Sequence, residues 1–351
     1  MIGNLISNVL VRKPGETAAP LPAGAAPTVE PEAAAVQPPA APVQAPAAEV
    51  GARDEFYRRK EYERGQAELW LRAQRLLRSL RTDPDWADPK RLERFGAKVY
   101  SQNDEDGILA EIFRRIGVRH KTFVEFGVGD GLENNTAWLL AQGWRGLWMD
   151  GGDENAKMIS YGFQPLIERG VLQFRQAFIT RDNVDELIAG AGLGAEIDLL
   201  SIDVDGNDLY LWEAINCISP RVVSIEYNAK FPPPAAWRIA YNPTHTWKGD
   251  DYMGASLGAI QRVAQAKGYR LAGCNLAGVN CFYVREDLAY GHFAEPASPE
   301  HLYQPARYDL IYAYRGGHGA TSLSIIQGAS EALGLAIDVP KVDATYTPDV
   351  P

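Results

Sequence analysis

From residue 98 to residue 290, short apolar runs alternate regularly with segments of helical pattern. Apolar strands of this length, separated by helices, predict a parallel sheet covered by helices on both faces. A last pair of strands is joined by the short segment "LAGV", which permits an antiparallel hairpin. We therefore predict an α/β fold with five parallel strands and a C-terminal hairpin. The expected strands are residues 121–128, 146–150, 171–179, 197–205, 221–228, 269–275 and 280–287, and the expected helices are residues 132–142, 155–170, 181–192, 209–216 and 254–268.

Four other segments flank this region. Residues 1–15 form an amphipathic N-terminal segment; residues 1–13 are interpreted either as a tether to a membrane surface or partner protein, or as a terminus without a role. Residues 16–51 are almost entirely Ala, Pro, Val and Glu, which predicts a disordered linker. Residues 52–97 are a predicted helical extension, with an amphipathic helix over 52–82 that is interrupted near Gly65. Residues 291–351 are a C-terminal extension without a clear pattern.

The composition excludes several classes of protein. A formal net charge of −10 argues against a nucleic-acid partner, which would need a basic face. Three scattered cysteines are too few for a disulfide framework or a zinc cluster, and they indicate a reduced, cytoplasmic compartment. If the N-terminal segment is a membrane tether, that location is the inner face of the membrane. No apolar run approaches the roughly 20 residues of a membrane-spanning helix.

The stretch "VEFGVGDG" lies at the carboxyl end of the first expected strand, where open α/β sheets bind their ligands. Its glycines, Gly127, Gly129 and Gly131, let the backbone bend sharply and approach a ligand. Their spacing is not that of the dinucleotide fingerprint, and no phosphate-binding lysine follows. Carboxylates at Glu125 and Asp130 would repel a pyrophosphate.

The second strand ends in Asp150, an acid suited to accepting hydrogen bonds from ribose hydroxyls. Taken with the acidic glycine loop, this residue favours a ligand that has a ribose and an ammonium group but no phosphate. S-adenosylmethionine has these properties, and it is the predicted cofactor.

Residues 98–287 resemble the class I, S-adenosylmethionine-dependent methyltransferases, and among them the FkbM-like family. The resemblance is carried by "SQNDEDGIL", "VEFGVGDGLENNT", "GWRGLWMDG", "LLSIDVDGND", "VVSIEYN" and the late hairpin "GYRLAGCNLAGVNCFYV". It implies a Rossmann-like sheet whose C-terminal antiparallel strands distinguish it from dehydrogenases, with the methyltransferase domain at residues 98–290. The family often has Glu-Pro after the second strand, where this chain has "MDGG", so the resemblance leaves the adenine contact unassigned. The residues that it implies for the cofactor are Glu125, Gly127, Gly129, Asp130, Gly131 and Asp150, together with Asn135 and Thr136, which could equally be a simple helix N-cap.

Acidic and amide side chains follow the fourth and fifth strands. Asp203, Asp205 and Asp208 end the fourth strand, and Glu226 and Asn228 end the fifth. The pattern resembles the magnesium site of catechol-type and macrolide-sugar O-methyltransferases, which implies Mg²⁺ ligands at Asp203, Glu226 and Asn228. The alternative is that Asp203 accepts hydrogen bonds from cofactor or substrate without a metal. The Asp203-x-Asp205 pair also resembles the metal site of glycosyltransferases that use nucleotide sugars.

A long segment between Ala229 and Gly254 holds five aromatic residues and a histidine. A loop of this length within a compact domain is usually functional, and aromatic rings suit the apolar face of a sugar. His245 is a candidate general base, because the imidazole of histidine is suited to removing a hydroxyl proton near neutral pH, although a loop histidine can also be an ordinary surface residue. The predicted catalytic residues are His245, Asp203 and Asp205.

These patterns together predict an O-methyltransferase that acts on a hydroxyl of a small molecule or glycan, in particular a sugar of a cell-surface polysaccharide. Two alternatives stay open: a metal-dependent glycosyltransferase, and a non-catalytic adaptor that keeps the fold. The sequence does not predict the oligomeric state.

Overall fold

The computed structural model describes residues 47–84, 87–311 and 322–328, with side chains from residue 54 onward. The chain divides into two compact units, residues 1–54 and 55–351. In the first unit only residues 47–54 are described, and they form the beginning of helix α1 (Ala47–Arg81). The predicted N-terminal segment 1–15 lies outside the described residues. The helix begins within the expected linker 16–51, because the last proline of that stretch is Pro46 and good helix formers follow it.

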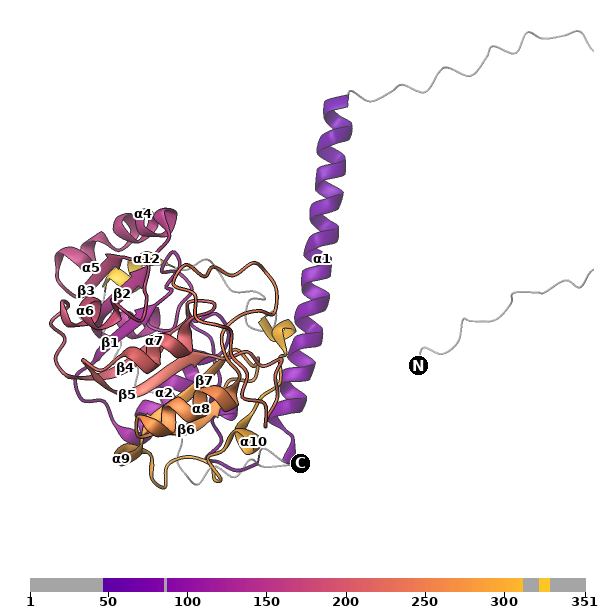
Figure 1. The fold of residues 1–351 in the computed structure, drawn as a ribbon. Helices are drawn as coiled ribbons and strands as arrows, with labels where there is room; N and C mark the ends of the chain where they lie inside the picture. Colours follow the sequence, from indigo (N-terminus) through magenta and orange to yellow (C-terminus); the bar gives the residue numbers. More distant parts are fainter. Residues whose placement is uncertain (1–46, 85–86, 312–321, 329–351) are drawn as a thin grey trace, which may run out of the picture. The chain divides into compact units, whose positions relative to one another are not determined.

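The second unit is built on one seven-stranded sheet with the order β3-β2-β1-β4-β5-β7-β6 (Figure 1). Strands β1 to β5 are parallel, and β7 runs antiparallel to both β5 and β6. This confirms the predicted Rossmann-like sheet with its C-terminal antiparallel hairpin. The strand order reverses between β1 and β4, which places the ligand-binding edge of such a sheet there. The strands are β1 (Thr122–Phe126), β2 (Arg145–Asp150), β3 (Leu172–Gln176), β4 (Glu196–Ile202), β5 (Ser219–Glu226), β6 (Tyr269–Cys274) and β7 (Asn280–Arg285).

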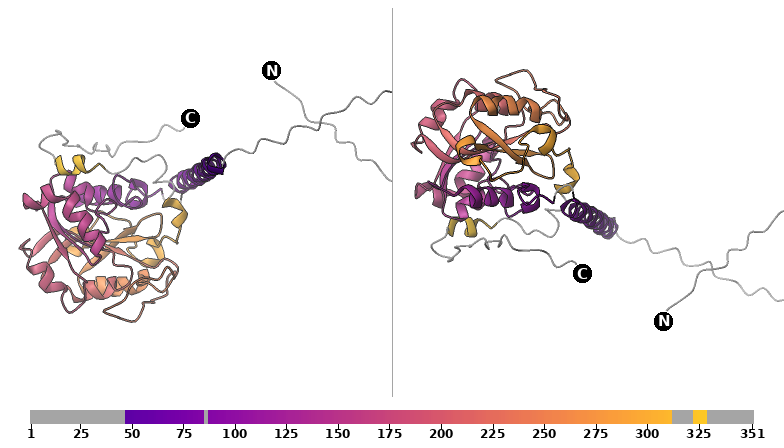
Figure 2. Two further views of the ribbon diagram at one scale, coloured as in Figure 1. Left: turned by 90° about the horizontal axis from the view of Figure 1, so that it is seen from above. Right: turned by 90° about the horizontal axis from the view of Figure 1, so that it is seen from below.

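Each face of the sheet has its own hydrophobic core. Successive strand residues point to opposite faces, so Val124 and Phe126 enter one core and Phe123 enters the other. Figure 2 shows the sheet between its two helical layers, as predicted. One core takes side chains from α6 (Val184–Ala189), α7 (Asp208–Ala214) and α8 (Leu257–Ala266), and the other from α2 (Glu105–Ile116), α3 (Ala137–Ala141), α4 (Asp153–Gly162) and α5 (Gln164–Glu168).

Two expected helices differ from the structure. The helix expected over 155–170 is divided into α4 and α5, because Pro165 in the first turn of α5 cannot continue the hydrogen bonding of α4. The helix expected from residue 132 begins only at Ala137, since the preceding residues form the loop that follows β1.

Helix α1 is continuous through Gly65, where an interruption was expected. A Cβ added at Gly65 would have no atom within 4 Å, so this position is open and no neighbouring group interrupts the helix there. Near its C-terminal end, Ala73 and Leu77 pack against Leu276 and Leu310. Among the described residues, no helix combines the length and the apolar character needed to cross a membrane.

Residues before and after the expected domain, residues 98–290, also contribute to the two main cores. Leu92 in η2 (Leu92–Phe95) and Leu302 in α10 (Pro299–Leu302) are fully buried there, as is Ile326 in α12 (Leu323–Gly328). The short α9 (Glu286–Ala289) and η3 (Tyr308–Leu310) complete the described C-terminal part. Residues 92–95, 299–302 and 323–328 therefore pack as part of the domain.

Candidate functional site

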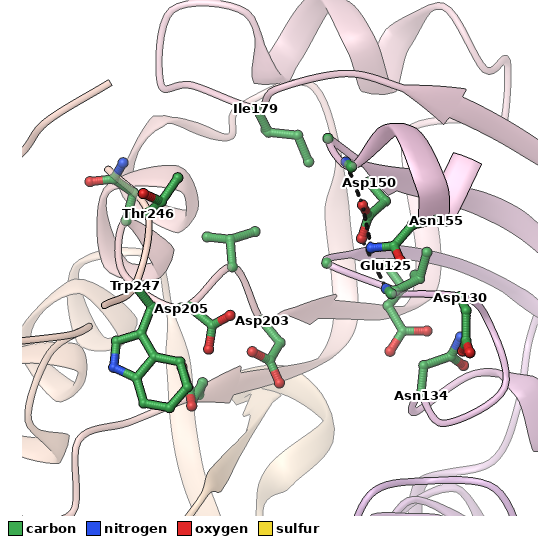
Figure 3. Close-up of a pocket in the computed structure, with 18 of the residues that line it drawn as sticks. Glu125, Asp130, Asn134, Asp150, Asn155, Ile179, Asp203, Asp205, Thr246 and Trp247 are labelled. Atoms are coloured by element: carbon green, nitrogen blue, oxygen red, sulfur yellow. Dashed lines mark hydrogen bonds between the residues drawn. The ribbon is translucent and has the colours of Figure 1, made fainter. Parts of the chain in front are cut away.

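A cavity of about 800 Å³ opens at the carboxyl ends of β1, β2, β4 and β5 (Figure 3). Its position is the ligand-binding edge expected for this strand order. The loops that follow these strands contribute side chains to its wall, with the segment around His245 representing the loop after β5. The start of β7 also contributes. The residues that line it include Gln102, Glu125, Gly127, Gly129, Asp130, Asn134, Asn135, Asp150, Asn155, Phe178, Ile179, Asp203, Asp205, Glu226, His245, Trp247 and Asn280.

Two of the three predicted glycines shape this cavity. Gly127 has φ +70°, and a Cβ there would lie 1.6 Å from the carbonyl oxygen of Asp203, so only glycine allows the loops after β1 and β4 to approach each other. Gly129 has φ +57° and open space beside it. Gly131 does not line the cavity, because its Cα faces the rings of Phe163 and Trp148. The third glycine is therefore needed for packing.

Asp150 fixes the geometry at the end of β2. Its Oδ2 accepts a hydrogen bond from the backbone N–H of Gly129 at 2.9 Å. Its Oδ1 accepts from the backbone N–H of Gly152 at 2.7 Å and from Nδ2 of Asn155 at 3.0 Å. A carboxylate oxygen can accept two hydrogen bonds, so Oδ2 keeps one acceptor position for a ligand.

Glu125 lines the cavity, but it is already engaged by the start of α3. Its carboxylate accepts hydrogen bonds from the backbone N–H groups of Asn135 at 2.8 Å and Thr136 at 3.1 Å, and from the Thr136 hydroxyl. Burial raises the pKa of Glu125 to about 7 against these hydrogen bonds. The Thr136 hydroxyl also accepts from Nε1 of Trp148 at 2.7 Å. Thr136 therefore supports the loop and does not line the cavity, whereas Asn135 does.

The N-terminus of α3 is capped by a residue that the sequence did not single out. Oδ1 of Asn134 accepts hydrogen bonds from the backbone N–H groups of Ala137 at 2.8 Å and Thr136 at 3.2 Å. Neither Asn135 nor Thr136 caps this helix with its side chain, so that part of the prediction is wrong. Asn135 instead donates from Nδ2 to the Ser201 hydroxyl on β4 at 3.1 Å.

Three acids converge between β4 and β5. One carboxylate oxygen from each of Asp203, Asp208 and Glu226 lies within 4.8 Å of the other two. Burial raises the pKa of Asp203 and of Glu226 well above the ordinary range, and repulsion from the neighbouring acids adds a smaller increase. Asp208 also holds its own loop, because its carboxylate accepts from the backbone N–H groups of Val204 and Gly206, each at 2.8 Å.

Asn228 does not belong to this group, although it was predicted as a metal ligand. Its Nδ2 donates to the backbone carbonyls of Asp251 and Met253 at 2.9 and 3.0 Å. Its Oδ1 accepts from the backbone N–H of Lys230 at 3.1 Å. Both ends of the amide are used to hold the following loop, so the prediction for Asn228 is wrong.

The two remaining predicted catalytic residues also line the cavity. Asp205 is exposed and has φ +54°, an uncommon conformation outside glycine. His245 packs against Gly206, where an added Cβ would lie 2.3 Å from its ring. Its Nε2 is buried and has no hydrogen-bond partner within the described part of the chain. This nitrogen is therefore an unsatisfied polar atom in the wall of the cavity.

Only one of the five aromatic residues in the loop after β5 lines the main cavity. Trp247 does so and is about half exposed. Tyr252 lines a smaller adjoining hollow. Phe231 stacks on Trp237 with ring centroids 4.1 Å apart, and Tyr241 packs edge-on against Tyr210, so these rings hold the loop in place.

Several lining residues were not predicted. Phe178 and Ile179 follow β3, and the apolar pair at the carboxyl end of the expected strand 171–179 was the usable signal. Gln102 belongs to a motif that was recognised without a role. Asn280 begins β7, and because β7 is antiparallel its start lies at the edge where the parallel strands end.

No protein-family model matches this sequence, and neither does any curated protein. Solved structures with a similar arrangement include a TehB-like SAM-dependent methyltransferase from Corynebacterium glutamicum, at 12% identity over 50% of this chain and 86% of that one, with a TM-score of 0.30. An O-methyltransferase family protein from Burkholderia thailandensis matches at 9% identity over 52% and 57%, with a TM-score of 0.32. A S-adenosylmethionine-dependent methyltransferase from Clostridium acetobutylicum matches at 9% identity over 50% and 89%, with a TM-score of 0.31. Identities and TM-scores this low do not assign an activity.

Proposed function

We propose that this protein is an S-adenosylmethionine-dependent O-methyltransferase. The observation that carries the proposal is the composition of the cavity. It joins a glycine loop and Asp150 at the ends of β1 and β2 to a group of acids and a free histidine nitrogen at the ends of β4 and β5. One end thus suits a ribose and an ammonium group, and the other suits a hydroxyl that must lose a proton.

The part of the cavity around Asp150 is the proposed cofactor site, because it offers a hydrogen-bond acceptor and apolar side chains. Asp150 would accept from a ribose hydroxyl through the free position on Oδ2. Phe178 and Ile179 lie beside it, since the next residue back, Ala177, donates its backbone N–H to the Asp150 carbonyl at 3.0 Å. These side chains would cover the faces of an adenine ring. Glu125 and Asp130 supply the acidic surface for the methionine ammonium (Figure 3).

The proposed reaction is in-line attack of the acceptor oxygen on the methyl carbon. The sulfonium charge disappears as the new bond forms, so the protein contributes mainly positioning and removal of the hydroxyl proton. Nε2 of His245 is the proposed base, because His245 lines the cavity and this nitrogen has no hydrogen-bond partner among the described residues. Asp203 and Asp205 would accept hydrogen bonds from the acceptor and hold its oxygen in line.

A sugar hydroxyl is the proposed acceptor, as part of a cell-surface glycan. The support is Trp247, whose half-exposed ring lines the cavity and offers a flat apolar surface. The glycosyltransferase alternative is weaker, because the three converging acids include Asp208 and not Asp205 of the Asp203-x-Asp205 pair. A tether through residues 1–13 is a separate proposal, which concerns residues outside those described.

The direct test is incubation of the full chain with S-adenosylmethionine and a panel of methyl glycosides, with mass spectrometry to detect the added methyl group. His245→Ala should lower kcat by about 10²–10⁴-fold, the usual contribution of a general base, without changing the affinity for S-adenosylhomocysteine. Trp247→Ala should raise KM for the glycoside. Unchanged turnover of His245→Ala would exclude this residue as the base. Cofactor binding without methylation of any glycoside would overturn the acceptor class alone.

A further inference from the structure

Asn280 is a buried side chain of the cavity wall that the proposed function does not use. It is only 3% exposed, yet it lines the cavity, and its Oδ1 has no hydrogen-bond partner within the described residues. A buried amide oxygen left without a partner costs free energy, so such an atom in a cavity wall points to a ligand.

The orientation of the Asn280 amide is fixed by Glu105, which is fully buried at the start of α2. Oε1 of Glu105 accepts from Nδ2 of Asn280 at 3.1 Å and from Nδ2 of Asn275 at 2.8 Å. It also accepts from Nδ2 of Asn103 at 3.3 Å. A carboxylate oxygen that receives these bonds requires the NH₂ group of each amide. The Asn280 oxygen must therefore point away from Glu105.

Asn280 pairs directly with Glu226 across the antiparallel β5–β7 ladder. Side chains of directly opposed residues lie on the same face of a sheet, with their Cβ atoms about 5 Å apart. Both residues line the same cavity, and Oε2 of Glu226 is also buried without a hydrogen-bond partner in the described structure. Two directly paired residues of the cavity wall thus each carry a buried oxygen without a hydrogen-bond partner.

The converging acids stand beside this pair. Asp203 also lines the cavity, and oxygens of Asp203, Asp208 and Glu226 lie within 4.8 Å of one another. Oxygens on opposite sides of a bound cation lie two bond lengths apart, roughly 4.1 Å for Mg²⁺ and 4.6–5.2 Å for Ca²⁺, so this spacing suits a hard divalent cation. No Arg, Lys or His among the described residues forms an ion pair with these three acids.

We propose that Asn280 Oδ1 joins oxygens of Asp203, Asp208 and Glu226 in a site for one hard divalent cation such as Mg²⁺, Mn²⁺ or Ca²⁺. The ligands are all oxygens, which is the donor set these cations prefer. The amide ligand comes from β7, where the sequence pattern had indicated Asn228 after β5. The site does not depend on the proposed methyl transfer. In that reaction, the cation would lower the pKa of the acceptor hydroxyl.

The test is calorimetric titration of MnCl₂ into the full chain after treatment with EDTA. The site predicts one Mn²⁺ per chain and a loss of binding in Asp203→Asn. Asn280→Ala should weaken Mn²⁺ binding by roughly tenfold or more. If the alanine variant does not fold, Asn280→Ser, which keeps a small polar side chain, is measured in its place. The matched control is Asn228→Ala, which removes an amide two residues after Glu226 that is not part of the proposed site, and it should change the affinity less than twofold.

Two results would overturn the proposal. One is the absence of Mn²⁺ binding up to millimolar concentration, which would mean that the acids are neutralised by protons or by a ligand's own donors. The other is a loss of affinity in Asn228→Ala with none in the Asn280 variants. The same samples are titrated with S-adenosylhomocysteine without metal. Mn²⁺ binding without binding of S-adenosylhomocysteine would refute the proposed function and leave the cation site standing.

Discussion

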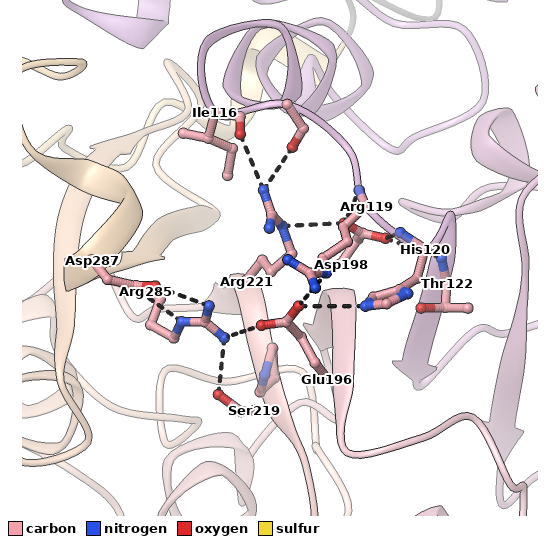
Figure 4. A network of polar contacts seen from close by, with 12 residues as sticks. Ile116, Arg119, His120, Thr122, Glu196, Asp198, Ser219, Arg221, Arg285 and Asp287 are labelled. Atoms are coloured by element: carbon pink, nitrogen blue, oxygen red, sulfur yellow. Dashed lines mark hydrogen bonds and ion pairs between the residues drawn. The ribbon is translucent and has the colours of Figure 1, made fainter.

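Replacing Asp198 by asparagine should destabilise the fold while leaving the ligand cavity intact. Asp198 lies near the amino end of β4, at the opposite edge of the sheet from the cavity, and is fully buried (Figure 4). Its Oδ1 accepts from the backbone N–H of Arg119 at 2.8 Å, and its Oδ2 from that of His120 at 2.6 Å. The guanidinium of Arg221 lies 3.3 Å from Oδ1, and the side chains of this ion pair are 8% and 0% exposed.

The magnitude follows from what asparagine cannot replace. It has one carbonyl oxygen, so it can accept from only one of the two backbone N–H groups and turns its NH₂ toward the other. Losing a hydrogen bond to a charged group costs about 1.5–3 kcal/mol. The substitution also leaves Arg221 buried without its counter-charge, and breaking a buried ion pair in this way costs about 3–5 kcal/mol. Both losses arise from the same carboxylate, so we expect about 3–5 kcal/mol in total rather than their sum.

The assay is urea-induced unfolding followed by tryptophan fluorescence, since Trp148 and Trp212 are fully buried reporters. Asp182→Asn is the matched control, because the Asp182 side chain is 79% exposed and its ion pair with Arg181 spans 3.8 Å. A surface pair of this kind should contribute less than about 1 kcal/mol. A change below about 1 kcal/mol for Asp198→Asn would show that the buried carboxylate does not stabilise the fold through Arg221 and the two backbone N–H groups.

Two further perturbations test the loop that follows β1. Gly127→Ala should prevent folding or shift the loop after β4, because the added Cβ would meet the Asp203 carbonyl. Gly129→Ala has open space for its Cβ, so only the strain of φ +57° should lower the free energy of unfolding, by about 1–2 kcal/mol. Equal melting temperatures for the two variants would contradict this. The raised pKa of Glu125, about 7 against an ordinary 4.5, means that its ionisation opposes folding. The protonated Glu125 side chain therefore adds up to about 3 kcal/mol to the free energy of unfolding below pH 4.5, and this stabilisation is lost as pH rises through 7. In Glu125→Gln, the free energy of unfolding should vary less with pH between pH 5 and 8 than in the unmodified protein. A difference between the two proteins that does not vary with pH would contradict this assignment.

The sheet could be predicted from the sequence because it depends on local patterns. Each buried strand is a short apolar run, and each covering helix carries one apolar stripe, so the order of elements follows from the chain itself. The division of the helix at Phe163 was also within reach, because Pro165 is visible in the sequence. Most of the motif at the end of β1 and Asp150 at the end of β2 line the cavity, while their role in binding a cofactor stays a prediction.

The residues at the acidic end were harder to predict, because they depend on how loops turn after the strands. Asn228 follows β5 but turns toward the Asp251 and Met253 carbonyls. Asn280 comes from a strand far along the chain, and only the antiparallel register of β7 on β5 brings it opposite Glu226. The apolar and acidic pattern around Asn280 carries no local sign of this pairing.

The proposed cofactor is tested by calorimetric titration of the full chain with S-adenosylhomocysteine, compared with Asp150→Asn. We expect micromolar binding that the variant weakens by at least roughly tenfold, because one charged hydrogen bond to the ribose is worth about 1.5–3 kcal/mol. The exposed neighbour variant Asp153→Asn is the control and should bind as the unmodified protein does. Absence of binding, with or without Mn²⁺, would contradict the proposal that this protein is a methyltransferase.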